Sequence, residues 1–211
     1  MTDEQAREFL FAVVAKYPNA QPTLVAHNPF EILVAVMLSA QTTDVAVNAV
    51  TPALFAAYPD AAHMAQATPE TLATYIDRLG LYRNKARYLQ ALSAKLVADF
   101  NGVVPKTYPE LCSLPGVGRK TATVVRTDAF NIPGIAVDTH VSRIIKGFGI
   151  AAATATPDQI QARLQALMPP ETWITLHRAL IQVGRQWLTA RNPQLPPEWQ
   201  RFAPYYAPLH H

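Results

Sequence analysis

The sequence predicts an all-α fold. Hydrophobic residues recur three and four positions apart in almost every segment, as they do along the buried face of a helix. No stretch alternates apolar and polar residues between hairpin turns, so strands are not expected. The 211 residues, half of them hydrophobic, suffice for one large domain or two small ones with a substantial core.

About ten short helices follow from the pattern. The hydrophobic stripes lie at residues 9–14, 32–37, 89–97, 141–148 and 176–183. Helix starts are predicted at Thr68 and Thr156, where a capping hydroxyl precedes a proline at the first helical position. Glycines mark predicted helix ends at Gly80, Gly102, Gly147 and Gly149.

The chain beyond residue 190 breaks this pattern. Its prolines are Pro193, Pro196, Pro197, Pro204 and Pro208, and they disfavour a long helix. The same segment holds four aromatic residues, namely Trp199, Phe202, Tyr205 and Tyr206. We therefore expect irregular chain that is held in place by aromatic packing.

Charge and cysteine content narrow the class of protein. The net charge of +3 and the pI of about 9.1 allow an acidic partner such as DNA without requiring one. The single cysteine, Cys112, excludes an internal disulfide and a metal site made of several thiolates. With no apolar run of membrane-spanning length and no signal peptide at the start, we expect a cytoplasmic protein without a membrane partner.

The most informative string is Leu114-Pro115-Gly116-Val117-Gly118-Arg119-Lys120-Thr121-Ala122, between short predicted helices at 108–112 and 121–130. Two glycines one residue apart permit a tight left-handed turn and expose the amides that open the second helix. Those amides and the helix dipole form an anion site suited to a phosphate. An ordinary glycine turn between helices is the alternative, which the preceding proline and the following Arg-Lys pair disfavour.

Lys120 lies at the start of that second helix. A lysine attacks a sugar C1′ only as a neutral amine, and we expect the helix N-terminus and partial burial to favour that form. A lysine that binds phosphate would suit the position equally well.

Asp138 follows a short apolar run and precedes a new helix, so helix N-capping is its simplest role. A capping carboxylate at the edge of a cleft could also stabilise positive charge on the sugar or assist proton transfer to and from the amine. His140 and Arg143 are expected to orient neighbouring groups or contact phosphate.

The string around Lys120 and a second string, Ile135-Ala136-Val137-Asp138-Thr139-His140-Val141-Ser142-Arg143, resemble the endonuclease III family of helix–hairpin–helix DNA glycosylases. Lys120 and Asp138 are eighteen positions apart, as in that family. The resemblance implies a base-excision repair enzyme that is both a glycosylase and an abasic-site lyase. Lys120 would displace an oxidised pyrimidine by Schiff-base chemistry, and β-elimination would then nick the strand. Asp138 would support both steps.

The resemblance extends over nearly the whole chain. Residues 38–44 and 80–86 are similar to two family loops, whose Gln41 and Leu81 would enter the duplex at a flipped base. From the residues alone, Gln41 would be a helix-end polar group and Leu81 part of the core. The DNA-binding set implied by motif and resemblance is Gln41, Leu81, Gly116, Val117, Gly118, Arg119, Thr121, His140, Arg143 and Arg191.

The family also implies a domain plan and a cation site. A six-helix, barrel-like domain would span residues 22–132 and contain the hairpin motif at about 108–130. Residues 1–21 and 133–211 would form a second helical domain, and double-stranded DNA with a damaged base or abasic site would lie in the groove between the two. Main-chain carbonyls of Cys112, Leu114 and Val117 would bind Na⁺ or K⁺. A monomer associated with the nucleoid suffices for this chemistry.

One feature departs from the family. Most endonuclease III relatives carry four cysteines that hold a [4Fe–4S] cluster, and the aligned positions here are Trp187, Gln194, Pro197 and Ala203. None is a thiolate ligand, so we expect no iron–sulfur cluster. In the family, the loop between the first two of these positions also contacts DNA, and Arg185 and Arg191 remain available for that contact.

Three other functions stay open. A monofunctional glycosylase for mismatched adenine, thymine or uracil is disfavoured by Lys120, which such relatives generally lack. A damage-binding protein without catalysis is disfavoured by the presence of both Lys120 and Asp138. A helical module that grips the DNA backbone is what the hairpin alone would indicate. The motifs do not encode which lesions are accepted.

Overall fold

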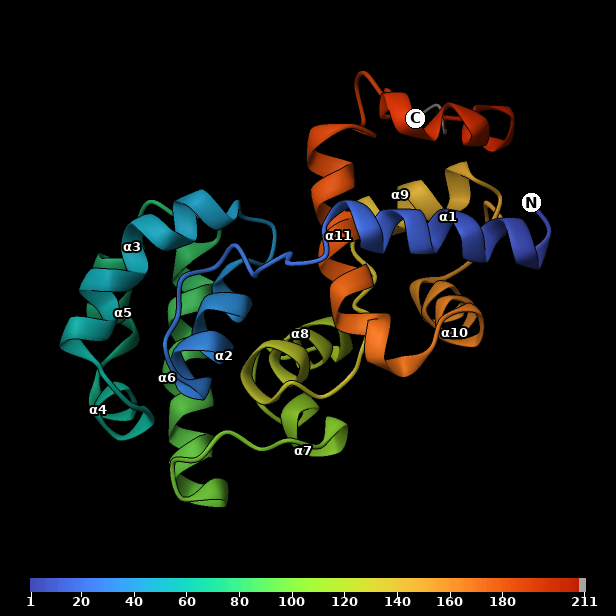
Figure 1. The fold of residues 1–211 in the computed structure, drawn as a ribbon. Helices are drawn as coiled ribbons and strands as arrows, with labels where there is room; N and C mark the ends of the chain where they lie inside the picture. The colour runs from blue at the N-terminus through green and yellow to red at the C-terminus, as the bar shows by residue number, and fades with distance from the viewer. Residues whose placement is uncertain (209–211) are drawn as a thin grey trace. The chain divides into compact units, whose positions relative to one another are not determined.

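The computed structural model describes residues 1–208, which form helices joined by short connections (Figure 1). The sole strand-like pairing in that range is an isolated antiparallel bridge between Leu188 and Pro193. The predicted all-α class is confirmed. No helix in the described range is both long and apolar enough to cross a membrane.

Backbone contacts divide the chain into two compact units. One is the continuous segment Pro22–Ile132, and the other joins Met1–Gln21 to the chain from Pro133 onward. We call them the middle unit and the terminal unit. Each has its own hydrophobic core.

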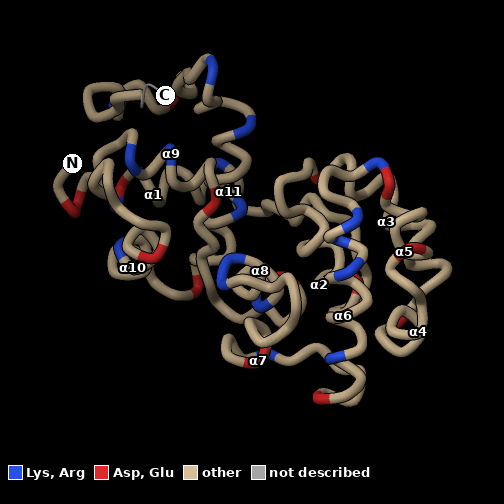
Figure 2. Tube along the Cα trace, turned by 180° about the vertical axis from the view of Figure 1, so that it is seen from behind, with Lys and Arg blue, Asp and Glu red and all other residues tan. Residues whose placement is uncertain are grey.

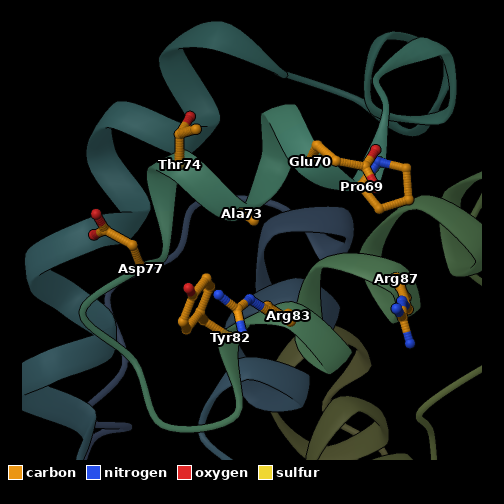
Figure 3. Close-up of a pocket in the computed structure, with 8 residues that line it drawn as sticks. All are labelled: Pro69, Glu70, Ala73, Thr74, Asp77, Tyr82, Arg83 and Arg87. Atoms are coloured by element: carbon orange, nitrogen blue, oxygen red, sulfur yellow. The ribbon is translucent and has the colours of Figure 1, made fainter.

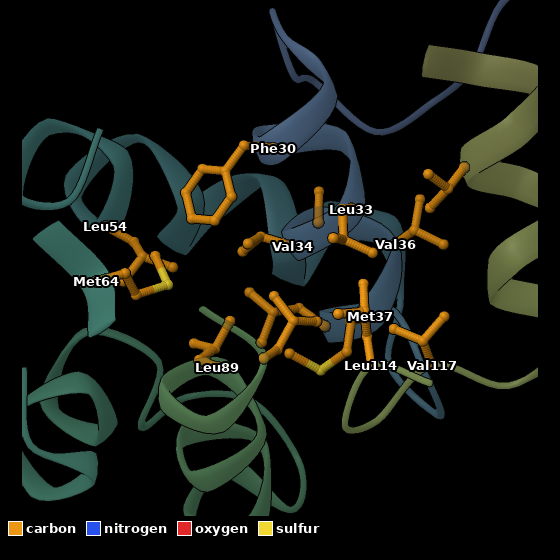
Figure 4. Close-up of a cluster of buried hydrophobic side chains, with 14 of the residues drawn as sticks. Phe30, Leu33, Val34, Val36, Met37, Leu54, Met64, Leu89, Leu114 and Val117 are labelled. Carbon is orange, nitrogen blue, oxygen red and sulfur yellow. The ribbon is translucent and has the colours of Figure 1, made fainter. Parts of the chain in front are cut away.

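The middle unit holds seven helices. They are α2 (Pro29–Leu38), α3 (Asp44–Ala57), α4 (Ala61–Gln66), α5 (Pro69–Tyr75), α6 (Tyr82–Phe100), α7 (Tyr108–Cys112) and α8 (Arg119–Phe130). Helix α2 is buried along almost its whole length, and Leu114 and Val117 from the loop before α8 reach the same core (Figure 4). The loop that carries the glycines is therefore anchored by apolar side chains on both sides of Gly116.

The terminal unit is built around Phe9. Its elements are α1 (Asp3–Lys16), α9 (Thr139–Gly147), α10 (Pro157–Leu167), the 3₁₀-helix η1 (Pro170–Thr172), α11 (Trp173–Gln186) and the 3₁₀-helix η2 (Pro197–Tyr205). The Phe9 ring lies 4.0 Å from that of Phe148, 5.5 Å from that of Trp199 and 5.4 Å from that of Phe202, between ring centroids. One aromatic cluster thus joins α1, α9 and η2.

The predicted helix starts at Thr68 and Thr156 are confirmed. Each side chain accepts a hydrogen bond from a first-turn amide, at 3.2 Å from Thr71 and 3.3 Å from Gln159. The prediction at Gly80 was wrong, because α5 already ends at Tyr75 and Gly80 lies in the turn before α6.

The tail, which we define as residues 187–208, differs in part from the irregular chain that was expected. Pro197–Tyr205 forms a 3₁₀-helix, with Pro197 at its first position, where no backbone N–H is needed. The expected aromatic packing is present, since Trp199 and Phe202 are buried beside Phe9. Proline content therefore excluded a long α-helix but not a short, tighter one.

Candidate functional site

The hairpin turn, residues 114–118, joins α7 to α8 through a left-handed residue. Gly116 has φ of +77°, and a Cβ there would lie 3.0 Å from Cγ of Tyr88 and 3.4 Å from Cγ of Met37. Only glycine satisfies both the backbone angle and the close packing. The predicted turn is therefore present, and it depends on Gly116.

Gly118 has a different role from the one predicted. Its φ of −90° and ψ of 176° are extended, not left-handed, and it is the N-cap of α8. A Cβ there would have no atom within 4 Å, so glycine is not required by packing. What glycine does is leave the cap without a side-chain hydrogen bond to the first amides of α8.

The N-terminus of α8 has the character of an anion site. The first bond of the helix runs from the Ala122 amide to the Gly118 carbonyl, at 2.9 Å. The amides of Arg119, Lys120 and Thr121 precede it and point out of the helix end, where the dipole favours negative charge. Figure 2 shows Lys and Arg residues gathered at this helix start and along the first half of α6.

Lys120 is the second residue of α8, and its side chain is exposed. The expected partial burial is therefore wrong for the protein alone. Exposure leaves the amine accessible to a ligand that binds at the helix N-terminus. Its neighbour Arg119 stacks on Tyr108, with the guanidinium 4.7 Å from the ring centroid, and Arg126 lies over the same ring at 4.1 Å.

Gln41 and Leu81 share an unusual backbone conformation. Their φ angles are 54° and 59°, in the left-handed region that residues with a Cβ seldom adopt, at a cost of about 1–3 kcal/mol each. Both side chains are exposed, and Leu81 is 59% exposed instead of lying in the core. The resemblance, and not the hydrophobic pattern, placed Leu81 correctly at the surface. Strained and exposed tips of this kind are typical of functional loops.

The donor set of the implied cation site fits a monovalent ion. Cys112, Leu114 and Val117 bracket the turn, and the Leu114 carbonyl accepts the Val117 N–H at 3.1 Å. A carbonyl oxygen has a second lone pair, so this bond leaves it able to bind a cation as well. Uncharged carbonyl oxygens are the ligands that Na⁺ and K⁺ take in proteins.

Asp138 lies in the terminal unit as the N-cap of α9. Its Oδ1 accepts a hydrogen bond from the Val141 amide at 2.8 Å, and the residue is half-buried. The simplest role predicted from the sequence is thus confirmed. The bond fixes the direction of the carboxylate, which the proposed second role also requires.

His140 and Arg143 connect α9 to α11. The Arg143 guanidinium donates to the Leu188 carbonyl at 2.7 Å from Nη2 and 3.2 Å from Nε, and to the Gly184 carbonyl at 3.1 Å. His140 packs so closely on Gly184 that a Cβ there would lie 2.7 Å from its Nδ1. Burial lowers the pKa of His140, and the nearby Asp138 charge opposes that shift. An orienting role suits both residues.

Sequence reasoning missed Gly184 as a contact residue. A glycine inside a helix costs about 1 kcal/mol relative to alanine, and this cost was the available signal. Arg191, in contrast, is exposed in the loop that follows α11, where it is accessible to a ligand.

The residues at the four cluster positions do not fit a [4Fe–4S] group. Trp187 donates its indole N–H to the Tyr17 hydroxyl at 3.1 Å, and the Gln194 amide donates to the Trp187 carbonyl at 2.9 Å. Pro197 and Ala203 belong to η2. None of the four positions offers a thiolate, because the sequence has a single cysteine, Cys112, and that residue lies in α7.

A pocket of about 470 Å³ lies between α5 and α6 (Figure 3). Arg83 and Arg87 of α6 line it together with Glu70 and Asp77, so its charges are mixed. None of the residues predicted for the site lines this pocket.

Comparison with known proteins places the chain in a family. The model of the HhH-GPD superfamily of base excision DNA repair proteins matches residues 34–170. Endonuclease III of Bacillus subtilis (strain 168) is 44% identical over 178 residues, which are 84% of this chain and 81% of that protein. The chain belongs to the endonuclease III family.

Solved structures of endonuclease III agree with this assignment. A non-covalent endonuclease III–DNA complex aligns with a TM-score of 0.92 and 41% identity, covering 98% of this chain and 95% of that one. A trapped endonuclease III–DNA covalent intermediate aligns with a TM-score of 0.89 and 43% identity, covering 92% and 91%.

Proposed function

We propose that this endonuclease III family member removes damaged bases from double-stranded DNA and then cleaves the strand at the abasic site. The observation that carries the proposal is the exposed amine of Lys120 beside the open N-terminus of α8. A phosphate held by those amides would fix the sugar–phosphate backbone next to a nucleophile. The trapped covalent intermediate of the 43% identical relative supports this chemistry.

In the proposed mechanism, the neutral amine of Lys120 attacks C1′ of a flipped nucleotide. The glycosidic bond breaks, and the base, an oxidised pyrimidine, leaves with the bonding electrons and a proton. The C1′–O4′ bond then breaks as the sugar opens, and O4′ keeps the bonding electrons and takes up the second amine proton, which leaves a Schiff base between C1′ and the Lys120 nitrogen. Removal of a C2′ proton then expels the 3′ phosphate by β-elimination, and Asp138 assists these proton transfers.

The DNA contacts divide by type. The amides after Gly116, with Arg119 and Thr121, would hold phosphate and position the duplex without reading sequence. Gln41 and Leu81 would fill the space left by the flipped nucleotide, which offsets part of the cost of a few kcal/mol for unstacking. A monovalent cation on the hairpin carbonyls would screen the bound phosphate.

We further propose that the protein works as a monomer in the bacterial cytoplasm, on nucleoid DNA, without an iron–sulfur cluster. The residues at the four cluster positions support the last point, since none is a thiolate. Iron and sulfide assays on anaerobically purified protein test it, and about four iron atoms per chain would contradict it.

The test of the function uses two labelled duplexes, one with an abasic site and one with thymine glycol. Each is incubated with and without borohydride, using wild type, Lys120→Ala, Asp138→Asn and the control Lys106→Ala, which changes an exposed lysine outside the hairpin. We expect nicking of both duplexes and a reducible adduct in wild type and Lys106→Ala, and neither in Lys120→Ala. Binding of the abasic duplex without adduct or nick would indicate a damage-binding protein instead.

A further inference from the structure

Lys85 is a buried cation that pairs with no carboxylate of residues 1–208. Its residue is 5% exposed, in the first turns of α6, and burial lowers the pKa of its ammonium group. Within the described chain, its ammonium donates to the hydroxyl of Thr42, with 2.5 Å between Nζ and Oγ1. Burying an ammonium opposite a neutral hydroxyl costs free energy that a methionine at this position would not. A costly group of this kind calls for a role that hydrophobic packing does not supply.

Lys85 holds two different loops. Its side chain holds the Gln41 loop, residues 39–43 between α2 and α3, and its backbone amide holds the Leu81 turn, residues 76–81 between α5 and α6. Its backbone amide donates to the Leu81 carbonyl at 3.0 Å, which is the first hydrogen bond of α6. Its side chain holds Thr42, whose hydroxyl in turn reaches the Ala40 carbonyl at 3.4 Å. The hydrogen bonds of Thr42 to Lys85 and to Ala40 therefore hold the residues on either side of Gln41. The hydrogen bond of the Lys85 amide holds Leu81 itself.

The two residues held in this way both combine a left-handed backbone with an exposed side chain. Gln41 and Leu81 have φ angles of 54° and 59°, and each would relax toward ordinary backbone angles if its loop were released. The bond from Lys85 in the first turn of α6 to Thr42, 43 positions earlier in the sequence, resists that relaxation in the Gln41 loop. The bond from the Lys85 amide to the Leu81 carbonyl resists it in the Leu81 turn.

We infer that Lys85 is a positioning residue that clamps the Gln41 loop to the Leu81 turn, so that both side chains are held ready to enter the duplex as one unit. The inference rests on the proposed function and deepens it. It assigns no contact between Lys85 and DNA. Preorganisation of this kind lowers the cost of ordering the loops when DNA binds.

The same face of α6 also reaches the hairpin turn. Tyr88 lies three residues beyond Lys85 and packs on Gly116, where a Cβ would be 3.0 Å from its Cγ. Residues spaced by three and four positions share one side of a helix. Helix α6 thus connects the Leu81 turn, the Gln41 loop and the hairpin turn within the middle unit.

The experiment compares two abasic duplexes under single-turnover conditions. In one the abasic site lies in a fully paired, stacked duplex, and in the other it lies in a bubble of unpaired bases, where little unstacking is needed. Three variants are compared. Lys85→Met keeps the length of the side chain without its charge, and Thr42→Val keeps the shape without the hydroxyl. Thr42→Ser is the control that retains the hydroxyl.

If the clamp acts on base flipping, Lys85→Met and Thr42→Val slow cleavage of the paired duplex on the order of tenfold and cleavage of the bubble by less than about twofold. Thr42→Ser restores the rate on the paired duplex. The double variant loses no more than either single one, because both remove the same bond. Thermal unfolding of each variant is measured alongside.

Other outcomes overturn the inference. Equal losses on the two duplexes, accompanied by a lowered Tm, indicate a merely structural bond, and unchanged rates indicate no role. If Lys85→Met does not fold, Thr42→Val and Thr42→Ser give the same comparison. Failure of the wild type to cleave even the bubble would instead refute the proposed function, so the two failures are distinguishable.

Discussion

The hairpin turn and the tail relate to the endonuclease III family in opposite ways. The turn keeps the residue types of the family motif, and its geometry shows why, since Gly116 has a left-handed backbone and no room for a Cβ. The tail has non-cysteine residues at all four cluster positions, yet it packs through Trp199 and Phe202 onto α1. One region depends on the identity of a single residue, and the other depends on buried volume.

The difference has a physical origin. A turn that presents backbone amides to a phosphate requires particular φ angles, which few residues adopt. Closing a C-terminal segment onto a domain requires only that enough apolar surface be buried, and aromatic side chains bury much surface per residue. Polar contacts add to the closure here, as the Gln5 side chain donates to the Tyr205 hydroxyl at 2.9 Å and the Ala207 amide donates to the Gly147 carbonyl at 2.8 Å.

The largest expected effect on stability is in the tail. Trp199→Ala leaves a cavity beside Phe9 and should lower the free energy of unfolding by about 3–5 kcal/mol. Urea denaturation measures this loss, with Trp187→Ala as a partner variant at a half-buried cluster position. A Trp199→Ala protein as stable as wild type would show that the tail does not replace the cluster by packing.

A change in the hairpin turn should lower stability less than Trp199→Ala does, but it should weaken binding to DNA more. Gly116→Ala places a Cβ against Tyr88 at a φ of +77° and should cost about 1–3 kcal/mol. Binding to an abasic duplex, measured by fluorescence anisotropy, should weaken because the turn shifts. Gly118→Ala is the matched control for stability, since its backbone is extended and its surroundings are open. Equal tolerance of both changes would contradict the role given to Gly116.

Two substitutions at Asp138 distinguish its role as a helix cap from its proposed role in catalysis. Asp138→Ala removes the bond to the Val141 amide and should cost about 1 kcal/mol, whereas Asp138→Asn keeps a capping oxygen and should be close to wild type in stability. Both variants should lose cleavage activity, because neither carries a carboxylate. Full activity in Asp138→Asn, measured on the abasic duplex, would leave Asp138 as a cap alone.

The smallest effect expected concerns pH. Burial lowers the folded-state pKa of His140 below its ordinary value of 6.5, so its contribution to stability is complete above that value and is lost as pH falls below it. The difference in Tm between pH 7.5 and 5.5 should therefore shrink in His140→Gln. An NMR titration that finds a His140 pKa above 6.5 would contradict this account.

Local signals in the sequence predicted much of the fold. The caps at Thr68, Thr156 and Asp138 could be recognised because a hydroxyl or carboxylate and the amide that it binds lie three residues apart. The exposure of Leu81 could not be obtained in this way, since a leucine in an apolar pattern indicates core, and only the family resemblance placed it at the surface.

Contacts between distant segments carried no signal in the pattern. The bond from Lys85 to Thr42 joins residues 43 positions apart, and a lysine in the first turns of a helix would ordinarily be exposed. The hydrogen bond from Arg143 to the Leu188 carbonyl likewise depends on how α9 packs against α11, which the sequence of α9 alone does not determine. For Lys120, the expected burial failed because the sequence indicates the helix start but not the surface around it.

The central claim is that the amine of Lys120 is the nucleophile, and peptide mapping of the borohydride-reduced adduct tests it most directly. Wild-type protein is trapped on an abasic duplex, digested with nuclease and protease, and analysed by mass spectrometry for the lysine that carries the sugar remnant. We expect the modification at Lys120 and nowhere else. Modification of Lys85, of another lysine or of the N-terminal amine, with Lys120 unmodified, would contradict it.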